Sequence, residues 1–127
     1  MEPPTGDNMK ETLAIRVYEV VGSTLCVASE DGQKVHDQIV SGLRNDRQVV
    51  VSFHNVESLT SAFLNAAIGQ LYATFTEEMI RAKLRVEEMQ SDDLVLLKRV
   101  VETAKQYFKN PKPFDDAARE ILGDDGK

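Results

Sequence analysis

The sequence predicts one α/β domain, in which a mixed sheet of about four strands carries three to four packed helices. Three observations lead to this prediction. Strand-like and helix-like segments alternate along the chain. The composition, 42% hydrophobic and 28% charged, is that of a globular protein. The length of 127 residues lies within the range of roughly 100 to 200 residues that is usual for one domain.

The strand predictions rest on apolar periodicity. Residues 12–21 alternate apolar and other side chains, the period of a half-buried strand that ends at Gly22. A short apolar piece follows at residues 24–28. Residues 49–53 are almost continuously apolar, which predicts a central strand covered on both faces. Residues 83–89 alternate apolar and charged side chains, which predicts a strand near the sheet edge.

Three helices are predicted from start signals and apolar stripes. The first runs from about residue 29, with Ser29 as its N-cap, to about residue 45; the second begins near Thr60 or Ser61; the third begins at residues 91–93. Apolar residues recur at helical spacing in each: Val35, Ile39 and Leu43; then Phe63, Ala67, Leu71 and Phe75; then Leu94, Leu97, Val101, Ala104 and Phe108.

These elements define the predicted domain organisation. Residues 1–10 are expected to be a flexible N-terminal tail, and residues 11–109 the folded domain. Residues 110–127 are rich in aspartate and are expected to form an acidic C-terminal tail or a short helix.

Charge and composition exclude several classes of function. A formal net charge of -6 with scattered basic residues predicts no nucleic-acid binding. No apolar run approaches the roughly 20 residues that span a bilayer, so no membrane association is expected. The N-terminus lacks a secretory signal pattern, which predicts a cytoplasmic location, and the single cysteine, Cys26, fits a reducing compartment.

Signatures of enzymes and cofactors were sought next. The glycines match neither the dinucleotide fingerprint nor the phosphate-binding loop. His36 and His54 lack a second histidine or cysteine at zinc-ligand spacing, so neither a metal nor a cofactor is expected. Cys26 lies in an apolar segment where a buried thiol is inert, and acidic pairs such as Glu87-Glu88 are interpreted as solvated surface. The chain is therefore not expected to be an enzyme.

One stretch, residues 49–69, stands out from the rest. A buried strand runs into a polar turn and then into hydroxyl residues at the start of a buried helix. Ser58, Thr60 and Ser61 would lie near free backbone N–H groups and the positive end of the helix dipole, where an added phosphate would be stabilised. The simpler interpretation, which the physics favours, is that Thr60 or Ser61 caps the helix.

This stretch resembles the STAS superfamily, the fold of the anti-sigma factor antagonists, and most of all its STAS-like branch of unknown function. The spacing of Phe53, Val56, Leu59, Ser61, Phe63, Leu64, Asn65 and Gly69 carries the resemblance. The sequence also departs from the pattern. Ser52 stands where the antagonists usually have aspartate, and Ala62-Phe63 replaces the Ser-Gly pair whose serine accepts phosphate. Asn65-Ala66 replaces an acidic pair that is common in the STAS-like branch.

The resemblance implies a non-catalytic regulatory module that binds another protein, such as a histidine-kinase-like ATPase or an anti-sigma-like protein. The contact would form at the strand-to-helix turn, through Ser58, Thr60, Ser61 and Asn65. Ser61 aligns with the first of the paired serines and Thr60 with the aspartate before them, so these two are the candidate phosphate acceptors.

Two alternatives remain open. The same helix N-terminus could serve as the anion pocket of a domain that senses a small ligand or a nucleotide. A homodimer could form if the edge segment with Leu84 and Val86 paired between two chains.

Overall fold

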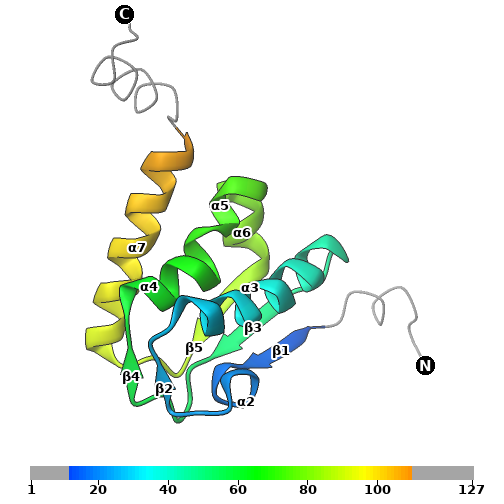
Figure 1. The fold of residues 1–127 in the computed structure, drawn as a ribbon. Helices are drawn as coiled ribbons and strands as arrows, with labels where there is room; N and C mark the ends of the chain where they lie inside the picture. Colours follow the sequence, from blue (N-terminus) through cyan, green and yellow to red (C-terminus); the bar gives the residue numbers. More distant parts are fainter. Residues whose placement is uncertain (1–11, 110–127) are drawn as a thin grey trace, which may run out of the picture.

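A computed structural model describes residues 12–109 (Figure 1). Its elements follow in chain order: β1 (Leu13–Arg16), α2 (Val17–Val21), β2 (Leu25–Cys26), α3 (Ser29–Arg44), β3 (Val49–Ser52), β4 (Ser58–Leu59), α4 (Ser61–Leu64), the π-helix η1 (Asn65–Gly69), α5 (Leu71–Thr74), α6 (Glu77–Lys83), β5 (Leu84–Glu87) and α7 (Ser91–Lys109). The predicted alternation of strands and helices is confirmed. The predictions for residues 1–10 and 110–127 lie outside the described part.

The strands form two parallel sheets, so the prediction of one mixed sheet of about four strands was wrong. One sheet has three strands in the order β1-β3-β5, and the other pairs β2 with β4. Helices lie in the connections between the three long strands, and such crossovers return the chain in a parallel direction. Within the described residues, β2 and β4 pair with each other and do not join the larger sheet.

β3 is central as predicted, but helices cover only one of its faces. Val49 and Val51 are fully buried, whereas Val50 and Ser52 on the opposite face are only half-buried. The order β1-β3-β5 makes both crossovers run in the same direction, and right-handed crossovers then place their helices on the same side. The prediction that β3 is covered on both faces was therefore wrong for the described residues.

The first strand is shorter than predicted, because it ends at Arg16 and the chain turns directly into α2. Val17 stays fully buried, which explains the alternating pattern up to that residue. Gly22 ends α2 in the left-handed conformation, with φ of 79°, and its N–H donates to the Tyr18 carbonyl. This is a common glycine C-cap, and it lets a single turn of helix replace the predicted strand.

α3 matches its prediction and buries Val35, Ile39 and Leu43, although Ala28 and not Ser29 is its N-cap. Two of its glycines let it approach its neighbours closely. A Cβ at Gly42 would lie 2.7 Å from Val49 Cγ2, and one at Gly32 would lie 2.4 Å from the backbone oxygen of Phe63. α3 therefore sits directly against both β3 and α4.

The second predicted helix is divided. A π-turn interrupts it, in which the N–H of Gln70 donates to the Asn65 carbonyl. At Phe75 the backbone becomes extended, and a further helix, α6, begins after Thr76, whose side chain accepts a hydrogen bond from the Met79 N–H. The sequence prediction missed α6. The predicted edge strand is confirmed, since β5 pairs only with β3 among the described strands.

α7 begins at Ser91 as predicted, but its inward face differs in part from the predicted stripe. Val100 and Ala104 are buried, and Leu96, Leu97 and Val101 pack partly against the core. Leu94, predicted to face inward, is 48% exposed. Because α7 packs against η1 and α4, the face centred on Val100 is the one that turns inward.

Candidate functional site

Thr60, where β4 leads into α4, is a helix cap. Its Oγ1 accepts a hydrogen bond from the Phe63 N–H at 3.2 Å and donates to the Val27 carbonyl at 2.8 Å. The hydroxyl therefore satisfies a free donor of the first turn and also ties α4 to the chain after β2. This confirms the capping interpretation for Thr60 over Ser61.

The other three predicted site residues lie in different surroundings. Ser58 is half-buried in β4, where it pairs in register with Leu25. Ser61, the first residue of α4, and Asn65, the first of η1, are both exposed. Gly69 leaves space beside Asn65, since a Cβ there would lie 2.5 Å from Asn65 Oδ1.

A groove runs between the α4 turn and α7. Its volume is about 480 Å³, and it is lined by Ser61, Ala62 and Asn65 on one wall and by Leu96, Arg99, Val100 and Thr103 on the other. The structure thus brings two of the four predicted residues, Ser61 and Asn65, into one site. Ser58 and Thr60 support that wall from beside it and do not line the groove.

Apolar side chains are exposed on α7 and on the segment around β2, which is bonded to the start of α4. Val95, one helical turn before Arg99, is 60% exposed. Leu25 and Val27 are 51% and 44% exposed. Leu25 pairs with Ser58 in β4, and the Val27 carbonyl accepts the Thr60 hydroxyl, so both residues lie beside the start of α4. Sequence reasoning missed the α7 wall. The sequence did contain a pattern that could have indicated this wall. Val95, Arg99 and Thr103 recur once per helical turn, beside the predicted inward stripe.

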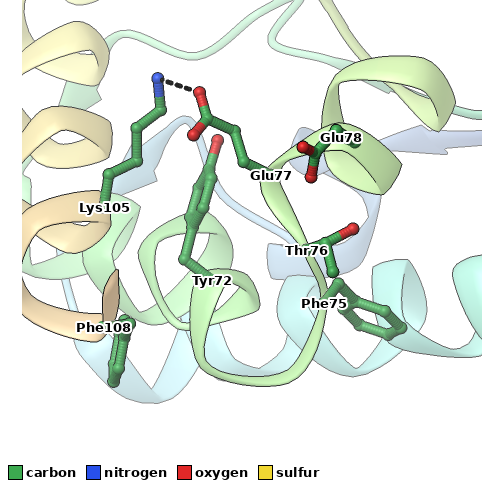
Figure 2. A pocket seen from close by; sticks show the side chains of 7 residues that line it. All are labelled: Tyr72, Phe75, Thr76, Glu77, Glu78, Lys105 and Phe108. Atoms are coloured by element: carbon green, nitrogen blue, oxygen red, sulfur yellow. Dashed lines mark ion pairs between the residues drawn. The ribbon is translucent and has the colours of Figure 1, made fainter. Parts of the chain in front are cut away.

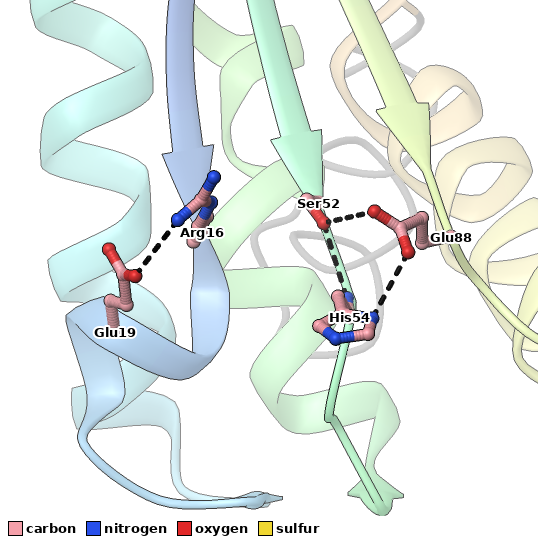
Figure 3. A network of polar contacts seen from close by, with 5 residues as sticks. All are labelled: Arg16, Glu19, Ser52, His54 and Glu88. Atoms are coloured by element: carbon pink, nitrogen blue, oxygen red, sulfur yellow. Dashed lines mark hydrogen bonds and ion pairs between the residues drawn. The ribbon is translucent and has the colours of Figure 1, made fainter.

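A second cluster, called here the strand-end pocket, lies where the strands of the larger sheet end (Figure 3). Ser52 Oγ donates to Glu88 Oε2 at 3.3 Å, and His54 Nδ1 lies 3.1 Å from Glu88 Oε1. The Ser52 hydroxyl is bonded to the carboxylate and not to the imidazole, so it is not arranged as a serine nucleophile with a histidine base. Sequence reasoning missed this cluster because it treated His54 and Glu88 as separate surface residues.

An aromatic pocket of about 240 Å³ lies between α5, α6 and α7 and includes Tyr72, Phe75 and Phe108 (Figure 2). At its edge, Glu77 binds Lys105 Nζ at 2.9 Å and Arg81 at 2.7 Å. The hydrogen bond to Glu77 raises the pKa of Lys105, and burial raises the pKa of Tyr72. The pair with Lys105 joins α6 to α7, whereas the pair with Arg81 lies within α6.

In the described part, the cysteine is not arranged for catalysis, and the acidic and histidine side chains are not grouped for metal binding. Cys26 is fully buried in β2, and burial, with a smaller contribution from Asp31, raises the pKa of its thiol to about 11. The thiol is therefore protonated at neutral pH, as expected for an inert cysteine. Within residues 12–109, no three His, Cys, Asp or Glu side chains are grouped as metal ligands would be. No helix of this described part is long and apolar enough to cross a membrane.

Comparison with known families places the chain. The family described as a STAS-like domain of unknown function (DUF4325) matches residues 31–94, half of the chain. The chain belongs to this family. No curated protein and no solved structure matches it significantly. The sequence resemblance to the STAS-like branch is thereby confirmed.

The STAS-like match covers the two parts of the groove unequally. Residues 31–94 include Ser61, Ala62 and Asn65 but end before Leu96, Arg99 and Thr103. The α4 wall therefore lies inside the segment that defines the family, and the α7 wall lies beyond it.

Proposed function

We propose that this STAS-like domain is a non-catalytic regulatory module that binds a protein partner through the groove between α4 and α7. The observation that carries the proposal is the groove itself. It joins the exposed polar residues Ser61 and Asn65 to Arg99, on elements that also expose apolar side chains.

The composition of the groove suits a protein surface. Ala62, Leu96 and Val100 provide apolar lining, and Ser61, Asn65, Arg99 and Thr103 provide hydrogen-bonding groups around it. Interfaces between proteins combine an apolar centre with a polar rim and are enriched in arginine. The exposed Val95 extends the apolar area along α7.

The walls of the groove are also firmly supported, so a partner would meet a preformed surface. Phe63 and Leu64 beneath the α4 wall are fully buried. On the α7 side, Val100 is only 8% exposed. Thr60 caps the first turn, and α3 packs against it through Gly32. A rigid surface loses little conformational entropy on binding.

The two candidate phosphate acceptors differ in their hydrogen bonds and exposure. Thr60 Oγ1 both donates and accepts a hydrogen bond, so phosphorylation would remove the α4 cap and its link to Val27. Ser61 is exposed in the groove and makes no such bond among the described residues. If the groove is regulated by a charge, Ser61 is the residue that can carry it without loss of the cap.

The test is affinity purification of the tagged full chain from its native host, followed by a binding titration with the recovered partner. We expect a specific partner of the histidine-kinase-like ATPase or anti-sigma-like class, whose binding Ser61→Glu and Arg99→Glu both weaken. Lys98→Glu and Ser41→Glu are matched controls, since both positions are exposed outside the groove.

Two results would contradict the proposal. One is a partner that binds all four variants equally. The other is a partner that the control substitutions weaken as much as the groove substitutions do.

The alternative, a small-ligand or nucleotide sensor at the same helix start, has some support from the groove volume of about 480 Å³ and from Arg99. It has less support from the backbone, because Thr60 already occupies the Phe63 N–H that an anion would use. Ligand-induced thermal stabilisation that Arg99→Glu abolishes, without any protein partner, would favour it.

A further inference from the structure

The strand-end pocket lies at the carboxyl end of the three-stranded parallel sheet. Arg16 and Ser52 are the last residues of β1 and β3 and pair in register, and Ser52 pairs with Glu87, the last residue of β5. The pocket of about 410 Å³ lies at this carboxyl end of the sheet (Figure 3).

The carboxylates of the pocket are occupied by the protein's own donors. Glu88 accepts the Ser52 hydroxyl on one oxygen and contacts His54 Nδ1 with the other. Glu19 Oε2 accepts from Arg16 Nη1 at 3.2 Å. The Ser52 oxygen in turn accepts the His54 N–H at 3.3 Å. These contacts orient the imidazole and the guanidinium.

Donors remain available to a ligand beside the two carboxylates. Arg16 uses one guanidinium nitrogen for Glu19 in the described structure, and a guanidinium carries several more N–H groups. Tyr18 and Asn55, which both carry neutral hydrogen-bond donors, also line the pocket. A guanidinium with neighbouring neutral donors is a typical receptor for a carboxylate or a phosphate group.

Two lining residues hold a backbone conformation that is rare for their type. Asn55 has φ of 67° and Glu88 has φ of 59°, both in the left-handed region. A glutamate seldom adopts this conformation. The bonds from Glu88 to Ser52 and His54 link the segment after β5 to the end of β3.

We propose that the strand-end pocket binds a small organic anion, whose carboxylate or phosphate group is held by Arg16 beside Asn55 and Tyr18. Glu19 and Glu88 act as positioning residues that orient Arg16 and His54. This site is separate from the groove between α4 and α7, so it does not depend on the proposed protein docking.

The proposal is tested by NMR titration of the full chain with inorganic phosphate and with acetate, at constant ionic strength maintained with sodium chloride. We expect at least one probe to cause saturable shifts of the Arg16 side-chain N–H and of the amides of His54, Asn55 and Glu88. Arg16→Gln should weaken this binding about fivefold or more, as loss of a charge-assisted contact does.

Arg85→Gln is the matched control, because Arg85 is exposed on the same face of the sheet but does not line the pocket. It should leave the affinity unchanged. Binding of phosphate alone would assign the site to a phosphate group, and binding of acetate alone to a carboxylate. Binding of both would support the shared oxyanion chemistry. Absence of saturable shifts, or equal effects of Arg16→Gln and Arg85→Gln, would overturn the proposal.

Discussion

The groove and the strand-end pocket are similar in size but are built in opposite ways. Helices carry the groove, and fully buried residues such as Phe63 and Leu64 lie behind its α4 wall. The strand-end pocket is held by hydrogen bonds and ion pairs between side chains that are mostly exposed, such as His54 at 66% and Glu88 at 56%. Substitutions behind the groove should therefore change stability strongly, and substitutions in the strand-end pocket should change it little.

The largest expected effect is on the alkylation rate of Cys26. Its backbone carbonyl accepts a hydrogen bond from the N–H of Thr60, the residue that caps α4. The thiol pKa of about 11, against an ordinary value of 9.0, leaves about a hundredfold less thiolate near neutral pH. Alkylation should therefore be at least that much slower in the native chain than in the denatured chain. Mass spectrometry of iodoacetamide-treated protein measures both rates. Equal rates would show that β2 opens readily.

Gly32→Ala should lower the free energy of unfolding more than Thr60→Val or Glu88→Gln does. Its Cβ would lie 2.4 Å from the Phe63 oxygen, which is backbone and cannot move without shifting α4. Overpacking of this kind costs about 1–3 kcal/mol, despite the better helix propensity of alanine. Urea unfolding followed by circular dichroism measures the change. Gln38→Ala, on the exposed face of α3, is the control and should be nearly neutral.

Thr60→Val should lower the free energy of unfolding by about 1–2 kcal/mol, because it removes the α4 cap and the bond to the Val27 carbonyl. Thermal unfolding of Thr60→Val is compared with that of Thr74→Val, an exposed threonine outside the cap. An equal change in both variants would show that the cap contributes nothing to the α4 wall.

Glu88→Gln should lower the free energy of unfolding least, by less than about 1 kcal/mol, because exposed ion pairs contribute little to stability. The same urea titration measures it. A loss of stability as large as that caused by Gly32→Ala would mean that the strand-end pocket stabilises the fold as much as the packing behind the groove does. That result would remove the contrast between the two regions.

The parts of the fold that the sequence predicted are those with long periodic segments. α3 and α7 repeat apolar residues over several turns, and β3 begins with three consecutive valines, so these elements were recognisable. α2 and α6 are short, so their bounds depend on the caps at Gly22 and Thr76 more than on apolar periodicity. β2 and β4 have two residues each, which is too few to show a pattern that would place them in a separate sheet.

The candidate site was predictable only where one continuous segment forms it. Ser61 and Asn65 lie in the strand-to-helix stretch, and their residue types and spacing drew attention to them. Arg99 joins them only because α7 packs against α4 and η1, which is a tertiary contact. Likewise, Ser52 meets Glu88 only because β5 pairs with β3 in one particular register.

The central claim, that a protein partner binds over the groove, is tested most directly by photo-crosslinking in the native host. A photoreactive amino acid replaces exposed Ala62 in the groove, and in a second strain it replaces exposed Gln38 on α3. The account predicts one specific crosslinked partner from position 62, lost when Arg99→Glu is added and absent from position 38. A crosslink from position 38 to the same partner, with none from position 62, would contradict it.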